Sequence, residues 1–164
     1  MPKSAKVKPI PEGFHTVTPG LRVRDAAAAI DFYERAFGAE VVYATRFPDG
    51  RVMHAELCIG DSRLFVGEEM PQMGQRGPLT LGGTTCTIHL YVRDVDTSFA
   101  RALKAGATVR QPIQDQFWGD RIGSVTDPYG HVWSIGTRKE AVPHEEIERR
   151  GQEWWERQLA ARRN

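Results

Sequence analysis

Hydrophobic positions follow the same order twice along this chain. In each half, a short alternating stretch precedes a stripe of helical spacing, and further alternating stretches follow the stripe. The two stripes comprise Ile30, Tyr33 and Phe37 in the first half and Val95, Phe99 and Leu103 in the second half. The pattern predicts a β-α-β-β-β unit that the chain uses twice.

Short motifs mark the same points in both halves. The Val-Arg-Asp motif at residues 23–25 returns at residues 92–94, before each predicted helix. Gly-Ala at residues 38–39 returns at residues 106–107, after each predicted helix. Two copies are too few for a solenoid, so we expect them to pair into a pseudo-symmetric α+β body with one curved sheet and a central cleft.

Turn-forming residues and helix-stop glycines set the boundaries of the elements. In the first half they predict a helix over 26–37 and strands over 15–24, 41–47, 51–59 and 64–67. In the second half they predict a helix over 95–104 and strands over 84–92, 108–113, 120–126 and 131–137. The chain is thereby divided into a flexible N-terminal arm (1–13), a first module (14–67), a linker (68–83), a second module (84–137) and a C-terminal amphipathic helix (138–164).

The C-terminal helix opens at Pro143 and has an apolar side formed by Ile147, Trp154, Trp155 and Leu159. An isolated helix of this length is only marginally stable in water. We therefore expect the two tryptophans to cover a surface, either of this chain or of a second copy.

Strand alternation predicts which side chains face the helices and which face the cleft. The predicted helix side holds Met53, Ala55, Leu57 and Ile59 in one module, and Ile88, Leu90 and Val92 in the other. The predicted cleft side holds Thr18, Gly20, Arg22, His54, Glu56 and Cys58, together with Thr87, His89 and Tyr91. This mixed polar and aromatic face is where a functional site is expected.

Composition narrows the possible partners and compartments. The 164 residues suit one domain or two half-size modules, and a net charge of +1 with mixed signs favours neither nucleic acid nor a membrane surface as partner. No apolar run is long enough for a membrane span or a signal peptide, which favours a cytoplasmic protein. Cys58 and Cys86 lack a paired spacing, so reduced thiols are favoured over a disulfide.

Several of these motifs together resemble a known superfamily. They are the repeated module, the Val-Arg-Asp and Gly-Ala motifs, Phe-Trp-Gly-Asp-Arg at 117–121 and DPYGHVWSIGTRKE at 127–140. The chain is similar over roughly residues 14–150 to the vicinal oxygen chelate superfamily of glyoxalases, bleomycin-resistance proteins and extradiol dioxygenases. Within it, the last motifs resemble the PhnB-like branch. One fold hosts many activities, so the resemblance implies the fold more strongly than the chemistry.

The metalloenzymes of that superfamily hold a divalent ion through four strand positions. Counted from the shared motifs, those positions are occupied here by Thr18, Leu64, Thr87 and Ser134. These residues do not form a zinc, nickel or iron site, which would need His and carboxylate ligands. The departure argues against glyoxalase I or ring-cleaving activity at the usual site, and no cofactor is expected.

A displaced divalent metal site is the alternative. His54, Glu56 and His89 are all predicted to face the cleft, and a ligand set of two His and one Glu is common in catalytic metal sites. The competing interpretation is that the histidines bond neighbours in a wet cleft while Glu56 pairs with Arg22 or Arg121.

Seven residues are candidates for ligand binding: Arg22, His54, Glu56, His89, Tyr91, Trp118 and Arg121. Trp118 could stack on a ligand and Arg121 could bind an anion in bidentate fashion. The competing interpretation for Arg121 is an Asp–Arg pair that fixes a loop.

The leading hypothesis is a protein of the bleomycin-resistance type that binds a small molecule in the cleft without the usual metal. The alternative is a metal-dependent lyase, isomerase or dioxygenase-like enzyme with the displaced His/Glu site, so the sequence leaves open whether the chain is an enzyme. A third possibility is a domain that only dimerises, its cleft filled by side chains. The resemblance also implies a homodimer.

Overall fold

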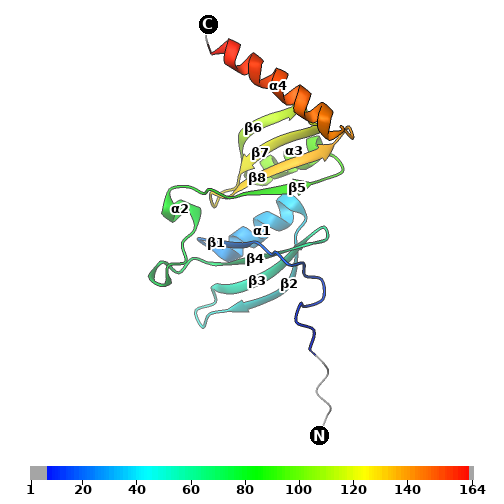
Figure 1. Ribbon diagram of the computed structural model, residues 1–164. Helices are drawn as coiled ribbons and strands as arrows, with labels where there is room; N and C mark the ends of the chain where they lie inside the picture. Colours follow the sequence, from blue (N-terminus) through cyan, green and yellow to red (C-terminus); the bar gives the residue numbers. More distant parts are fainter. Residues whose placement is uncertain (1–6, 163–164) are drawn as a thin grey trace. The chain divides into compact units, whose positions relative to one another are not determined.

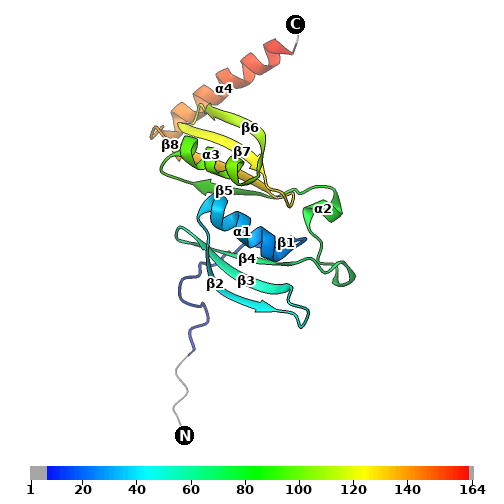
Figure 2. The same ribbon diagram turned by 180° about the vertical axis from the view of Figure 1, so that it is seen from behind.

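The computed structural model describes residues 7–162, and the chain within it forms two compact units (Figures 1 and 2). The first unit contains the chain up to Thr84 together with Pro128–Gly130. The second contains Thr85–Asp127 and the chain from His131 onward.

The first unit contains a four-stranded sheet with strand order β1-β4-β3-β2. Strand β1 runs parallel to β4, whereas the other neighbours are antiparallel. Helix α1 lies across one face of the sheet (Figure 2). The elements are β1 (Gly20–Val23), α1 (Ala26–Phe37), β2 (Glu40–Arg46), β3 (Val52–Ile59), β4 (Ser62–Glu68), the 3-10 helix η1 (Pro71–Met73) and α2 (Pro78–Leu81).

The start of α1 is fixed by two carboxylates. Asp25 adopts a left-handed conformation (φ 59°), which Asp tolerates better than most residues, and its side chain accepts a hydrogen bond from the Ala28 N–H. The buried carboxylate of Glu68 accepts hydrogen bonds from the N–H groups of Asp25 and Ala26, both at 2.9 Å. The helix ends at Gly38 (φ 69°), as its glycine predicts.

The second unit repeats the topology of the first. Its sheet has the order β5-β8-β7-β6, again with one parallel and two antiparallel pairings, and α3 covers one face (Figure 2). The elements are β5 (Thr87–Tyr91), α3 (Val95–Ala105), β6 (Thr108–Asp115), β7 (Asp120–Thr126), β8 (Val132–Arg138) and α4 (His144–Ala161). The predicted duplication of a β-α-β-β-β module in an α+β fold is confirmed.

The tip of the hairpin between β7 and β8 belongs to the first unit. The Tyr129 ring lies 6.3 Å from Phe32 and 6.4 Å from Tyr33, two buried rings of α1. Immediately before the tip, buried Asp127 accepts hydrogen bonds from the His131 N–H and the Trp133 Nε1–H, both at 2.9 Å. The Asp-Pro-Tyr-Gly-His-Val-Trp motif therefore has a structural role in this fold.

The predicted inward side of β3 was wrong at one position. Ala55 and Leu57 are buried as expected, but Met53 is 39% exposed and Val52 is buried in its place. The pairing register shows why: Thr45 pairs with His54 while Arg46 pairs with Val52, so Met53 is the extra residue of a β-bulge. A bulge reverses the alternation beyond it.

The structure also differs from the predicted element boundaries in two places. The first strand was expected over residues 15–24 but comprises only Gly20–Val23, the stretch that pairs with β4. The linker contains two short helices. Glu69 stabilises the second, α2, by accepting hydrogen bonds from the N–H of its N-cap Gly77 and from Thr80, and it also accepts one from Arg24. The N-terminal arm lies partly outside the described residues, and its residues 7–13 form neither helix nor strand.

Candidate binding pocket

The open face of the second sheet, opposite α3, carries the candidate site. Its side chains follow the register of three strands: His89 pairs with Ser134, Tyr91 with Gly136, and Asp120 with Arg138. The close approach of His89 to the sheet requires the glycine at Gly136. A Cβ there would lie 3.2 Å from the His89 Cε1 atom and 2.9 Å from the Ile122 Cγ1 atom.

A pocket of about 440 Å³ opens on this face and is lined by Tyr91, Trp118, Asp120 and Arg138. β5 supplies Tyr91, β7 and β8 supply Asp120 and Arg138, and Trp118 comes from the turn between β6 and β7. Pockets that combine aromatic walls with a few polar groups are typical of small-molecule sites.

Asp120 fixes both aromatic walls. The residue is only 6% exposed, and its Oδ2 atom accepts hydrogen bonds from the Tyr91 hydroxyl at 2.9 Å and from the Trp118 Nε1–H at 3.3 Å. The bond to Asp120 raises the pKa of Tyr91 above its ordinary value, so Tyr91 stays protonated at neutral pH. One carboxylate therefore holds two rings in fixed orientations.

Arg138 supplies the positive charge of the pocket. Its side chain is exposed, and its Nε–H donates a long hydrogen bond of 3.4 Å to the Glu140 carbonyl. Within residues 7–162 no ion pair within 4.0 Å occupies this guanidinium. Its remaining N–H groups are available to a ligand.

His89 lies beside the pocket and is neutral at pH 7. Its Nδ1 atom lies 3.0 Å from the Ser134 hydroxyl oxygen, and its ring meets Tyr91 edge-on at 4.4 Å. Partial desolvation lowers the pKa of His89, although the Asp120 carboxylate opposes the shift. His89 therefore supports the Tyr91 ring as a neutral group.

Arg121 lies on the opposite face of the sheet, towards α3. It donates to both carboxylate oxygens of Asp96 at 2.9 and 2.8 Å and to Asp115 at 3.2 Å. These bonds raise the pKa of Arg121 above its ordinary value. Arg121 thus connects α3 to the end of β6, in keeping with the interpretation as a structural Asp–Arg pair, and it does not line the pocket.

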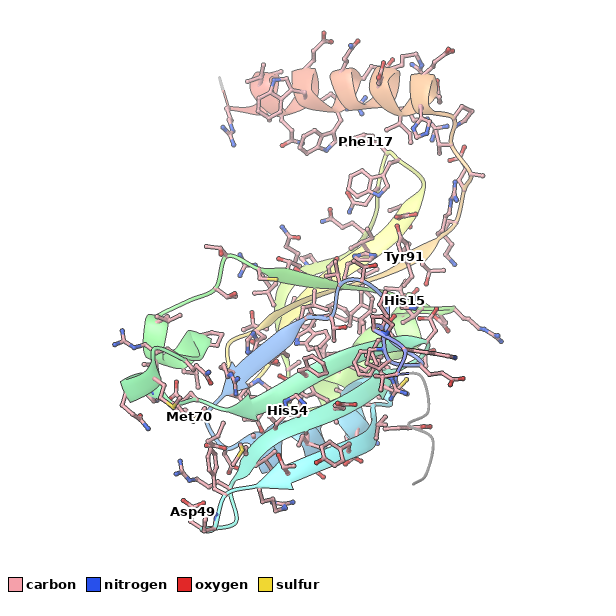
Figure 3. All side chains as sticks on the ribbon, turned by 60° about the horizontal axis from the view of Figure 1, so that its bottom comes forward. His15, Asp49, His54, Met70, Tyr91 and Phe117 are labelled. Atoms are coloured by element: carbon pink, nitrogen blue, oxygen red, sulfur yellow. The ribbon has the colours of Figure 1, made fainter. Side chains whose placement is uncertain are left out.

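The other three predicted ligand-binding residues lie in the first unit, on the open face of its sheet. Arg22 lies across Gly67, where a Cβ would come within 2.5 Å of the Arg22 Nη1 atom. The His54 ring lies 4.9 Å from Phe65, and its Nε2 atom is 3.8 Å from a Glu56 carboxylate oxygen (Figure 3).

The residues at the superfamily's metal positions do not fit a divalent ion. Leu64 is buried and does not lie on the open face, where its neighbour Phe65 pairs with Gly20 as Ser134 pairs with His89. Phe65 therefore occupies the position that the motif count assigned to Leu64 and offers no ligand atom, and the Ser134 hydroxyl is hydrogen-bonded to His89. The displaced set is divided, with His54 and Glu56 in the first unit and His89 in the second. Among residues 7–162, no three His, Cys, Asp or Glu side chains gather as a metal site would require.

Of the seven predicted residues, the pocket includes Tyr91 and Trp118, with His89 beside it. Asp120 and Arg138 were not among the predicted residues. Alternation along β7 and β8 would have placed both on the same face as Tyr91, but only once the register of the two strands is known.

The helices within residues 7–162 include none that is both long and apolar enough to cross a membrane.

Comparisons with known proteins place the chain among relatives with the same fold. An uncharacterized protein of Mycobacterium bovis, Mb0911c, is 48% identical over 135 residues, which cover 80% of this chain and 89% of the relative.

Solved structures agree with that relationship. TioX from Micromonospora sp. ML1 superposes with a TM-score of 0.60 at 27% identity, covering 76% of this chain and 98% of that chain. The fosfomycin resistance protein FosX from Mesorhizobium loti has a TM-score of 0.56 at 21% identity, covering 75% of this chain and 91% of that chain. A family model matches residues 13–135, and the chain belongs to the Glyoxalase/Bleomycin resistance protein/Dioxygenase superfamily.

Proposed function

We propose that this protein binds a small organic molecule in the pocket of its second unit and releases it unchanged. The observation that carries the proposal is the double hydrogen bond to Asp120, which holds Tyr91 and Trp118 as the walls of the pocket. Preorganised aromatic side chains bind ligands with little loss of conformational entropy.

The chemistry of the surrounding residues favours binding over conversion. The open-face strand positions that would hold a catalytic metal carry a phenylalanine and hydroxyl side chains. The neutral His89 contacts Ser134 and the Tyr91 ring. The family description includes resistance proteins, and sequestration of a toxic compound requires a pocket but no reaction.

The proposal is tested by screening small molecules for an increase in melting temperature, because a ligand that binds only the folded state stabilises it. Compounds that raise the melting temperature are then titrated by calorimetry against the wild type and Trp118→Ala. We expect Trp118→Ala to weaken binding at least tenfold, since it removes one wall of the pocket.

Trp155→Ala is the matched control, because Trp155 is exposed on α4 and does not line the pocket. The affinity of Trp155→Ala for the ligand should stay within twofold of that of the wild type. Mass spectrometry of the compound after incubation should recover it unchanged. Equal binding by Trp118→Ala and wild type, or the appearance of a product, would overturn the proposal.

A further inference from the structure

We infer that the ligand of this pocket is a planar aromatic molecule that carries an anionic group, with the ring against Tyr91 and Trp118 and the anion on Arg138. The inference rests on the proposed binding function and specifies the class of ligand. Some polar groups of the pocket are already hydrogen-bonded to other residues of the protein, whereas others are available to a ligand. This difference indicates the class of ligand.

The aromatic walls offer ring faces rather than hydrogen bonds. The Tyr91 hydroxyl and the Trp118 Nε1–H both donate to Asp120, so neither donor is available to a ligand without breaking an existing bond. Tyr91 is nevertheless 66% exposed, which leaves most of its surface open to contact. A flat aromatic molecule is the partner that such surfaces bind best.

Trp118 also packs against a second aromatic ring. Phe117, labelled in Figure 3, packs edge-on against Trp118 with ring centroids 4.9 Å apart. Trp154 of α4 lies 5.9 Å from Phe117. A ring fixed by a hydrogen bond and an edge-on neighbour keeps one orientation. The pocket is therefore selective for shape, which favours a rigid planar ligand over a flexible chain.

The two charges of the pocket differ in how accessible they are. The negative charge of Asp120 is buried, and the oxygen that faces the aromatic walls already accepts two hydrogen bonds. The positive charge of Arg138 is exposed, and the 3.4 Å bond to Glu140 involves only its Nε–H. A cationic ligand would have to compete with Tyr91 and Trp118 for Asp120, whereas an anion meets open guanidinium donors.

Two matched probes test the anionic group. Naphthalene-2-sulfonate and naphthalene-2-sulfonamide have the same ring system, and only the sulfonate is charged at pH 7. We expect calorimetry to show the sulfonate binding at least tenfold more tightly than the sulfonamide to the wild type. Arg138→Gln should abolish that difference and leave sulfonamide binding within twofold, while Arg138→Lys should retain part of it.

Lys139→Gln is the control for loss of one positive charge, because Lys139 neighbours Arg138 in sequence and does not line the pocket. It should keep the full preference for the sulfonate. Unchanged melting temperatures and circular dichroism spectra would show that the variants fold.

The outcomes separate this inference from the proposed function. Equal affinity for both probes in the wild type, with both weakened by Trp118→Ala, would overturn the anionic class and leave the binding function standing. Retention of the sulfonate preference in Arg138→Gln would also overturn it. If neither probe binds, the ligand class is wrong, and the wider screen of small molecules still decides whether the pocket binds a ligand.

Discussion

Asp120 and Asp127 show how one residue type serves two purposes at the two ends of β7, since Asp120 is its first residue and Asp127 directly follows its last. Each aspartate accepts a hydrogen bond from a tryptophan Nε1–H. Asp127 does so in the core, where it fixes Trp133 beside the hairpin turn. Asp120 does so at the wall of a pocket, where it also accepts from Tyr91.

The bond between Tyr91 and Asp120 predicts a pH dependence of stability. The pKa of Tyr91 is raised in the folded protein, so the folded state holds this proton at pH values where the unfolded state releases it. The bond therefore stabilises the fold below the ordinary tyrosine pKa of about 10, and this contribution is lost as the pH rises through the raised value.

Tyr91→Phe removes that contribution. We expect urea unfolding midpoints to fall more steeply between about pH 9 and pH 11 for the wild type than for Tyr91→Phe. Tyr43→Phe is the control, because Tyr43 is an exposed tyrosine of β2. The unfolding midpoints of this variant should fall with pH as steeply as those of the wild type. Parallel pH profiles for wild type and Tyr91→Phe would contradict the prediction.

At the scale of elements, α4 is held to its unit by a few contacts near its start. Arg150 pairs with Glu140 at 2.9 and 3.0 Å, and Phe117 lies against Gly151 and Trp154. Beyond this point the helix extends away from the sheet, and Trp155 remains 51% exposed (Figure 1). Phe117 thus connects α4 to the pocket wall.

Phe117→Ala should loosen α4 and Trp118 together. We expect amide hydrogen exchange over residues 144–161 to quicken by about tenfold, because the helix loses its aromatic anchor and isolated helices fray readily. Ligand affinity should fall in parallel, since Trp118 loses its edge-on neighbour. Phe47→Ala, in the hairpin between β2 and β3, is the control and should change neither quantity. Faster exchange with full affinity would show that α4 and the pocket are independent.

Sequence patterns predicted the elements well and the side-chain partners less well. The helix over Ala26–Phe37 was predicted to the residue, because its caps and its apolar stripe are local signals. Met53 was misplaced because a bulge depends on strand register, which is not local. The Asp96 partner of Arg121 lies on α3, 25 residues away in sequence, and only the folded chain brings the two together.

The candidate site was predicted in part for the same reason. Tyr91 and Trp118 attract attention as aromatic residues on an expected cleft face. Asp120 and Arg138 become pocket residues only through the pairing of β7 with β8. The duplication does not predict these pocket residues either, because the strand position of Tyr91 is occupied by Arg22 in the first module.

At the scale of the whole molecule, the exposed tryptophans predict self-association. Trp154, Trp155 and Leu159 are 41%, 51% and 39% exposed on α4. Exposed apolar surface of this kind often marks a site of protein association. We expect light scattering to give the mass of a dimer for the wild type and of a monomer for the double variant Trp155→Ala, Leu159→Ala. Ligand binding should survive in the monomer, since neither residue lines the pocket and Trp154, which packs against Phe117, is retained. A wild type that is monomeric at high concentration would contradict the prediction.

The position of Tyr129 has a consequence for any attempt to divide the molecule. The duplication suggests two halves that could be expressed as separate fragments, with a cut near Thr84. A fragment ending there would lack the ring that covers Phe32 and Tyr33, and its α1 would present that apolar surface to solvent. The boundary between the two sequence repeats therefore does not coincide with the boundary between the two compact units. A stable fragment of the first module would need a substitute for the three residues at the hairpin tip.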